Sequence, residues 1–450
     1  MHQRTLTVAL LGACACSSSG TTQPDGGVVM DQCPAPSGSG TDHSGFLPAD
    51  QTWTAASGPH RITSDLTIPQ GLTLTIEACA VVQLAKDVQI NVNGKLAAMG
   101  TSGHQVRFEA IDAAQPWAQI QATRTVVRPG IELHHTRLSG GGKVSANDVE
   151  VAHLIYVRGD SGGPMLLVDH VEISGSVTSG IGLFDEATFA PGSTALKISG
   201  SGGAPVVMNG YALTNLPDGD YSGNTIDRIL IDNARLGRND QTLEIVAHNR
   251  GTPYRLGIFG NTKVWYLGAP VGSAITTLRI EPGVRLLMAK DFSIYVASVN
   301  DAASAAIIAQ GTASAPIELG SDAATPMAGD WRGILFGAPP TADTILDHVV
   351  FRYCGSLVTE TNGFSCGTEP ATDKGGIVGA LMFASNRPIT RQILVNSAIE
   401  DSASNGIDRG WTGDPVDYLP TNTFTRVAYC TQTLPRPSMG QCPDPAPCPR

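Results

Sequence analysis

Three aspartates stand close together near the middle of the chain. Asp218 and Asp220 belong to a Pro-Asp-Gly-Asp turn, and Asp227 follows it. Farther along, Asp330 and Arg332 flank a tryptophan. Enzymes that cleave acidic polysaccharides group carboxylates to hold Ca²⁺ or to act as acid and base, with Arg or Lys abstracting a proton beside a uronate. We interpret the first group as turn chemistry and the second as part of a fold motif, so no catalytic residue is predicted.

A second chemical signal is the string Gly-Asp-Ser-Gly-Gly-Pro at residues 159–164. It resembles the nucleophile segment of trypsin-like serine proteases. The His segment of that family is absent, and Asp148 precedes Ser161 so closely that the two belong to neighbouring segments. At the matching place in the second half of the chain, residues 373–376 read Asp-Lys-Gly-Gly. A position that accepts Ser in one half and Lys in the other is predicted to be a turn, not a protease site.

Histidines recur in a small motif of the form apolar-x-His/Asn-x-x-apolar. His135, His153 and His170 lie 18 and 17 residues apart, and His348 has the same setting in the second half. Histidine is the commonest metal ligand, but Asn233 fills one such place and we expect no Cys or carboxylate cluster to converge there. The pattern predicts side chains stacked at a corner of a repeating fold, about one coil apart, with no metal and no cofactor.

The elements that must position these residues are strands. Only 15% of residues are charged while 42% are hydrophobic, Asp outnumbers Glu, Arg outnumbers Lys, and there are 51 glycines. This composition is poor in residues that fill exposed helix faces and rich in residues that form turns, so it favours an all-β protein. Short alternating segments separated by turns support it: 72–76, 88–92, 106–108, 278–280 and 294–296.

The chain also repeats itself in order. Ile76-Glu77 returns as Ile280-Glu281, and Trp117 returns as Trp331. Further matches keep the same order: Leu133 with Leu346, His135 with His348, and Gly180-Ile181 with Gly406-Ile407. The sequence therefore predicts a tandem duplication, with a first copy over 46–240 and a second copy over 241–430.

Two related strings suggest a family. LTIEACAVVQLAKD begins at residue 74 and LRIEPGVRLLMAKD at residue 278; with GDWRGILF and LDHVVFRYCG they resemble bacterial surface lipoproteins of the right-handed parallel β-helix, pectin-lyase-like type. The resemblance implies a single-stranded right-handed parallel β-helix solenoid with coils of about 20–25 residues. The first copy departs from the pattern at Ala78-Cys79, where the second has Pro282-Gly283.

The first residues read as an export signal. Residues 1–13 carry a basic start and an apolar stretch, and Leu11-Gly12-Ala13 precedes Cys14, which resembles the site at which bacterial lipoproteins are cleaved and lipidated. An ordinary secretory signal cut near Ala13 or Ala15 is the alternative, and Cys16 is a competing lipidation site. Residues 14–45 are Ser-, Gly- and Pro-rich and are expected to form a flexible tether. The lipid is the only membrane contact predicted.

Cysteine usage fits an oxidising compartment. Cys354 and Cys366 flank a Gly/Thr-rich segment and are expected to staple one loop, and Cys33 with Cys79 could tie the tether to the first strands. No spacing typical of zinc sites occurs.

The tail over residues 431–450 is rich in Pro and Cys. It contains Cys442 and Cys448, with Cys430 just before it, and we expect it to cover the C-terminal end of the solenoid.

A net charge of −11 argues against nucleic acid as a partner. The sequence predicts an exported lipoprotein of the outer membrane or cell surface that binds extracellular polysaccharide or protein without catalysis. The alternative is a surface-tethered polysaccharide lyase or glycoside hydrolase acting on acidic polysaccharide.

Overall fold

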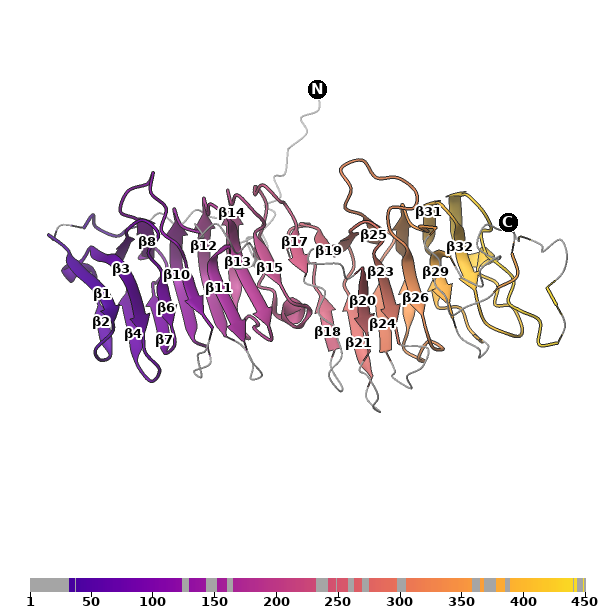
Figure 1. The fold of residues 1–450 in the computed structure, drawn as a ribbon, viewed down its shortest axis with the longest axis horizontal. Coiled ribbons are helices and arrows are strands. Elements are labelled where there is room, and N and C mark those ends of the chain that lie inside the picture. The colour runs from indigo at the N-terminus through magenta and orange to yellow at the C-terminus, as the bar shows by residue number, and fades with distance from the viewer. Residues whose placement is uncertain are drawn as a thin grey trace, which may run out of the picture.

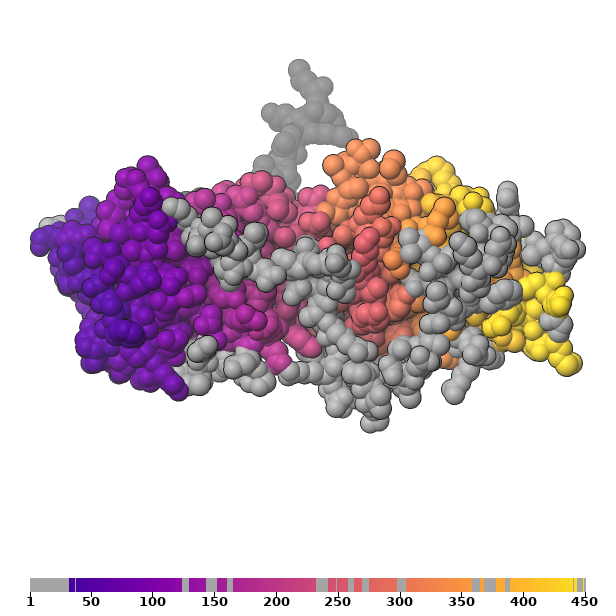
Figure 2. Space-filling model, in the orientation of Figure 1, coloured from indigo at the N-terminus to yellow at the C-terminus, as the bar shows by residue number. Residues whose placement is uncertain are grey.

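Short strands stack in parallel along one axis, from indigo β1 to yellow β32 (Figure 1). The computed structural model describes residues 32–36, 38–123, 129–142, 152–159, 165–231, 242–247, 249–257, 263–268, 275–297, 305–357, 365–367, 378–384, 389–439, 441–442 and 448. The chain forms a right-handed parallel β-helix, as predicted, and the space-filling view shows its elongated body (Figure 2). Within the described ranges, no helix has the length and apolar character needed to cross a bilayer.

In the first copy the strands form three ladders. Ladder A contains β2 (Gln51–Trp53), β4 (Thr73–Glu77), β7 (Lys95–Met99) and the first parts of β10 (Ile131–Ser139) and β12 (Leu166–Ser174). Ladder B contains β1 (Thr41–Phe46), the start of β3 (His60–Ile68), β5 (Val81–Leu84), β8 (Val106–Ala110), the ends of β10 and β12, β14 (Thr194–Ser199) and β16 (Gly219–Asp220). Ladder C contains the end of β3, β6 (Ile90–Val92), β9 (Ile120–Ala122), β11 (His153–Gly159), β13 (Ser179–Asp185), β15 (Val206–Met208) and β17 (Ile229–Ile231).

The second copy repeats this arrangement. Ladder A′ contains β18 (Thr242–Ile245), β21 (Thr276–Ile280), β24 (Ala305–Gln310), β27 (Ile345–Asp347) and β30 (Leu394–Val395). Ladder B′ contains β19 (Tyr254–Leu256), β22 (Arg285–Met288), β25 (Ile317–Ser321), β28 (Val349–Arg352), β31 (Ala398–Ser402) and β33 (Thr423–Val427). Ladder C′ contains β20 (Val264–Leu267), β23 (Ser293–Val296), β26 (Gly333–Phe336), β29 (Gly379–Phe383) and β32 (Asn405–Arg409).

The two tryptophans that match in sequence occupy matching places. Trp117 and Trp331 are both fully buried. The indole N–H of Trp117 donates to the carbonyl of Ser139, 22 residues later, and that of Trp331 donates to Arg352, 21 residues later. Each tryptophan therefore fills the core and satisfies its polar atom on the adjacent coil, which is how a buried indole is usually accommodated.

Coil length varies more than the sequence suggests. The amide of Thr73 donates to Asp50, 23 residues earlier, whereas Arg352 pairs with Glu400, 48 residues later. The interpretation of the histidine spacing as one coil is wrong. The coil from β10 to β12 spans 35 residues, and His153 lies on ladder C, part of the way around the same coil.

The interior follows the alternation of the strands. Inward positions carry Ile, Leu, Val and aromatic side chains that stack on equivalent positions of the next coil, and together they form one continuous cluster from Leu47 to Tyr418. Because every central strand pairs on both sides, its backbone polar groups are satisfied along the axis while the apolar side chains are removed from water.

The two copies meet at a seam where the ladders change partners. By sequence β22 matches β5 of ladder B, yet ladder B′ stacks through β19 on β17 of ladder C, with Ile229 opposite Tyr254 and Ile231 opposite Leu256. Ladder A is continued at this level by the 3₁₀ helix η3 (Gly210–Asn215), against which β18 packs. Ladder B′ is therefore offset from its sequence counterpart in the first copy, whereas ladder A′ follows ladder A through η3.

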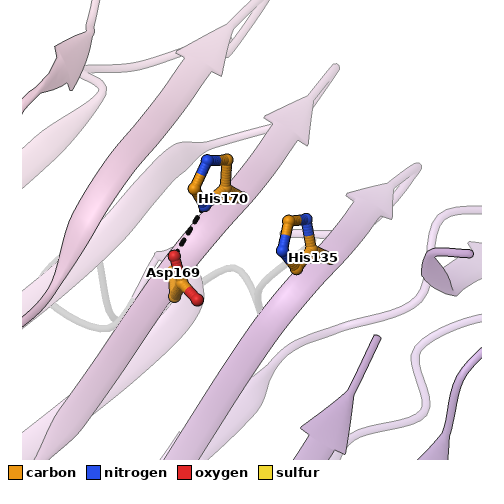
Figure 3. Close-up of side chains that lie close together, drawn as sticks. All are labelled: His135, Asp169 and His170. Atoms are coloured by element: carbon orange, nitrogen blue, oxygen red, sulfur yellow. Dashed lines mark hydrogen bonds and ion pairs between the residues drawn. The ribbon is translucent and has the colours of Figure 1, made fainter. Parts of the chain in front are cut away.

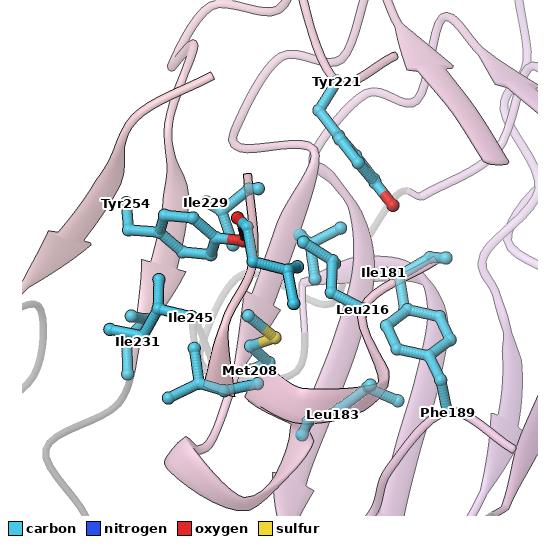
Figure 4. Close-up of a cluster of buried hydrophobic side chains, with 14 of the residues drawn as sticks. Ile181, Leu183, Phe189, Met208, Leu216, Tyr221, Ile229, Ile231, Ile245 and Tyr254 are labelled. Carbon is cyan, nitrogen blue, oxygen red and sulfur yellow. Dashed lines mark hydrogen bonds between the residues drawn. The ribbon is translucent and has the colours of Figure 1, made fainter. Parts of the chain in front are cut away.

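The core cluster continues through the seam. Figure 4 shows Met208, Leu216 and Tyr254 among the apolar side chains that fill it. Asn209 is fully buried; its side-chain oxygen accepts from the amides of Tyr211 and Ala212, and its amide donates to Ala187 at 3.0 Å. This N-cap pairs two backbone amides of the first turn, so a short 3₁₀ helix can begin inside the molecule.

Among the described residues three disulfides are formed, and one of the expected pairings is wrong. Cys33 is bonded to Cys79, which fixes residue 33 to the first coils. Cys366 is bonded to Cys442, not to Cys354. Cys354 is a free cysteine, because its side chain belongs to the core cluster and is fully buried there.

The third disulfide joins Cys430 to Cys448, and residue 434 pairs with residue 366, so residues of the tail lie against the last coils. The predicted export signal, Cys14, Cys16 and residues 14–31 of the predicted tether lie outside the described residues.

Candidate functional site

Two histidines and an aspartate meet where ladder A turns into ladder B (Figure 3). His135 lies on β10 and His170 directly beside it on β12. Both have positive φ, 39° and 54°. In a regular strand neighbouring side chains point to opposite faces, but a left-handed residue breaks that alternation. As a result Asp169 and His170, adjacent in sequence, both turn toward solvent on the same side.

The side chains of this corner are in contact. Nδ1 of His170 lies 2.6 Å from Oδ1 of Asp169, and the rings of His135 and His170 stack with centroids 4.6 Å apart and planes 17° apart. Nδ1 of His134 lies 3.2 Å from the other carboxylate oxygen. One ligand atom from each of His135, Asp169 and His170 lies within 4.8 Å of the other two.

Electrostatics in the corner reflect this crowding. Partial burial, together with the neighbouring His170, lowers the pKa of His135, although Asp169 opposes the effect. Burial alone would raise the pKa of Asp169, but hydrogen bonds from His170 and His134 outweigh it and lower that pKa. The carboxylate is therefore an anion held between imidazoles.

The expectation that no carboxylate converges on these histidines is wrong. Asp169 reaches them because the left-handed residue after it redirects the strand. The stacked corner itself was predicted, and His348 (φ 51°) and Asn396 (φ 48°) repeat it in the second copy. There Asp347 bridges the two, with His348 Nδ1 at 2.7 Å and Asn396 Nδ2 at 3.0 Å from Oδ1.

Two of the three clustered aspartates are engaged in local structure. Asp220 accepts from the hydroxyl of Ser222 at 2.7 Å and pairs with Arg250 at 3.6 Å. Asp227 accepts from two backbone amides of its own turn, at 2.7 and 3.1 Å. Asp218 lines a shallow hollow of about 280 Å³ beside η3. These contacts match the turn interpretation, and none gathers the three carboxylates on one point.

Asp330 and Arg332 point in different directions. Asp330 accepts from Ser321 Oγ at 2.6 Å and from the amide of Met327 at 2.9 Å, which closes a turn. Arg332 lies on the outer surface, where burial lowers its pKa while Asp291 and Tyr266 oppose that shift.

Around Arg332 lies a group that the sequence did not single out. On the outer side of ladder C′, the rings of Tyr266 and Tyr295 meet edge to face, 5.3 Å apart and 84° between planes. Asp291 is held by Lys263 Nζ at 2.9 Å and by Ser356 at 3.2 Å. We call Tyr266, Tyr295, Lys263, Asp291 and Arg332 the tyrosine platform. Its sequence signal, a Tyr at the outward position of two strands one coil apart, is visible only once the register is known.

Of the Gly-Asp-Ser-Gly-Gly-Pro string, only Gly159 lies in the described ranges, at the end of β11. Ser161, Asp148 and residues 373–376 lie outside them, as does Asn233.

Comparison with known proteins returned no matching family model, no similar curated protein and no similar solved structure.

Proposed function

We propose that this protein is an exported, lipid-anchored rod of the pectin-lyase-like type that binds extracellular polysaccharide along its outer surface. The tyrosine platform is the observation that carries the proposal. Tyr266 is 38% exposed and lies one coil from Tyr295. An aromatic ring offers a flat apolar surface for the C–H face of a sugar, and its hydroxyl can pair with the sugar's own.

The charges beside the platform suit an acidic sugar. Lys263 is half-exposed and Arg332 is partly buried, so both can reach a ligand lying on the rings. Guanidinium groups pair well with carboxylates, and partial burial strengthens such contacts. Asp291 holds Lys263 in place and can accept from sugar hydroxyls. The preferred ligand is a polymer containing uronate units.

Binding without cleavage is favoured because three of the four candidate carboxylates are already engaged in local structure. Asp220 and Asp227 support their turn, and Asp330 closes another. A lyase or hydrolase needs such groups directed at one substrate bond. The alternative, enzymatic function is therefore kept as a possible outcome of the binding experiment, which also measures product release.

In affinity electrophoresis, gels that contain a uronate polymer should retain the purified mature protein and slow its migration. The protein should release neither unsaturated products nor reducing ends from these polymers, with or without Ca²⁺. Tyr266→Ala should weaken retention, whereas Phe46→Ala, which removes a 75% exposed aromatic side chain at the N-terminal end of the rod, should not. Product release would establish the enzymatic alternative. Equal retention by both variants would refute the platform.

The anchor is tested separately. Three disulfides are compatible with an oxidising exterior, and the Cys33–Cys79 bond would place the tether's end beside the first coils. Cys14→Ser should abolish incorporation of labelled fatty acid and release the protein from the membrane fraction, whereas Cys16→Ser should leave both unchanged. Labelling that survives Cys14→Ser would move or remove the anchor.

A further inference from the structure

The corner formed by β10 and β12 brings together two imidazoles and a carboxylate that neither the core nor the tyrosine platform uses. We propose that His135, Asp169 and His170 bind a divalent transition-metal ion of the Zn²⁺ class at the surface of the first copy. The inference is independent of the polysaccharide-binding function, because the two groups of residues lie in different copies.

The donor set favours this class of ion. Two imidazole nitrogens with one carboxylate oxygen are borderline ligands suited to Zn²⁺, Ni²⁺ and Cu²⁺, whereas Ca²⁺ and Mg²⁺ prefer oxygen alone. Three protein ligands leave a coordination position for water, and the corner faces solvent, since His170 has 55% of its side chain exposed. The site is therefore an open one, accessible from solution.

The geometry requires only a small change. Ligand bonds of about 2.1 Å in a tetrahedral site put donor atoms about 3.4 Å apart. The donors now lie within 4.8 Å of one another, and His170 Nδ1 is already 2.6 Å from Asp169. Nearly parallel rings cannot direct in-plane lone pairs at one ion, so one ring must turn. The exposed His170 has room to do so without disturbing the core.

His134 completes the arrangement as a positioning residue. It lies in register with Asp169 on the adjacent strand, and its Nδ1 is 3.2 Å from Oδ2, the oxygen that His170 does not contact. An imidazole on one oxygen orients the carboxylate so that the other can face the ion, which is how outer partners tune metal sites.

The second copy offers an internal control. In register terms His348 corresponds to His135, and Asn396 to His170. Its corner holds Asp347 with only one imidazole, because Asn396 supplies an amide instead. An amide is a weaker ligand for these ions than imidazole, so the two corners should differ in affinity although their backbones match.

Isothermal titration of tag-free mature protein with Zn²⁺ alone should give one site per chain, confirmed by elemental analysis after desalting. His135→Asn, Asp169→Asn and His170→Asn should each weaken binding at least about tenfold, and His134→Asn less than these. His348→Asn should have no effect. Co²⁺ should give visible absorption bands of a nitrogen-ligated ion that are lost in His170→Asn.

Asn396→His should add a second site, because it gives the second corner two imidazoles around Asp347. Circular dichroism of each variant should be unchanged, since the substituted side chains lie at the surface. The proposal is overturned by absence of Zn²⁺ binding in the wild type, by unchanged affinity in His135→Asn and His170→Asn, or by equal loss in His348→Asn.

Discussion

At the N-terminal end of the rod the core finishes in a stack of neutral rings, whereas at the C-terminal end a charged guanidinium is buried beside the rings of Trp411 and Tyr418. His43 of β1 continues the inward row of Ile62, and Trp53 continues that of Ile76. Trp53 stacks on His43 at 4.0 Å and on His60 at 4.8 Å. The three rings cover the last aliphatic layer, and His60 Nε2 lies 2.9 Å from the carbonyl of Thr54.

At the other end, Arg409 stands in register after Phe383, an inward residue of ladder C′. Its guanidinium donates to the carbonyl of Val416 at 2.6 Å and to that of Thr433. Beside it Asp408, also buried, accepts from the amide of Val378 at 3.1 Å. Later residues of the chain supply the acceptors: the isolated bridges of 407 with 432 and 412 with 436 stack them on the last coil.

The difference shows two ways to end a stack of parallel strands. Rings close the core by packing, and they must stay uncharged because a buried imidazolium is costly. A guanidinium closes it by hydrogen bonding, and it needs carbonyls held in place by a further segment. The predictions below test whether each end depends on the device that it displays.

The largest effect is expected for Trp53→Ala. It removes a nearly fully buried ring from the terminal layer, and truncation of buried aromatics usually costs about 3–5 kcal/mol. In a solenoid the loss should appear first as fraying of the nearest coils. Hydrogen exchange should accelerate in residues 41–68 and remain unchanged in 398–409. Uniform acceleration along the rod would contradict a local capping role.

Arg409→Met should cost about 2–4 kcal/mol, because the buried Thr433 carbonyl and the partly buried Val416 carbonyl lose their charged donor. The apolar replacement preserves packing, so the loss reports mainly the hydrogen bonds. Arg285→Met is the matched control, since it removes an exposed partner of Glu318. Denaturant unfolding should show a larger loss of stability for Arg409→Met than for Arg285→Met. A more stable Arg409→Met protein would show that the charge does not hold this end.

The fold could be predicted from the sequence because strand alternation recurs in every coil. The duplication is also visible in ordered matches between the two copies, such as the paired tryptophans. Sequence reasoning failed where one backbone dihedral decides the outcome. A positive φ at His170 brings Asp169 to the histidines, and alternation alone would place the two on opposite sides. The Cys354 pairing failed for a related reason: nearness in sequence did not reveal that Cys354 faces inward. The seam depends on which ladder stacks on which, information that no local pattern contains.

Lowering the pH should affect the two ends in opposite directions. Burial, with His60 nearby, lowers the pKa of His43 from 6.5 to about 4, and burial lowers that of His60 too. Their contribution to stability is present above pH 6.5 and is lost as the pH falls toward 4. Burial raises the pKa of Asp408 from 3.8 to about 6. As the pH falls, Asp408 therefore takes up a proton in the folded state before it does so in the unfolded state. That end loses stability as the pH rises from 3.8 to 6.

Hydrogen exchange, corrected for the pH dependence of the intrinsic rate, separates these effects by peptide. Between pH 6.5 and 4, residues 41–53 should lose protection while residues 405–411 gain it. His43→Phe should reduce the first change only, and Asp408→Asn should remove the second only. If both ends weakened together in acid, the proposed difference between them would not exist.

The smallest effect is expected for Arg61→Gln at the N-terminal end. Arg61 Nε lies 2.9 Å from Asp42 Oδ1, where both side chains remain partly exposed on the coil that contains the ring stack. Solvent screens such a pair, and long side chains lose entropy when held, so its removal should cost less than about 1 kcal/mol. In about 0.5 M NaCl the cost should shrink further, because the screening length falls to a few ångströms. The cost of Trp53→Ala should hardly change with salt, since packing of neutral rings carries no net charge. A salt-sensitive loss in Arg61→Gln that approached that of Trp53→Ala would mean that surface charge, rather than the rings, closes this end.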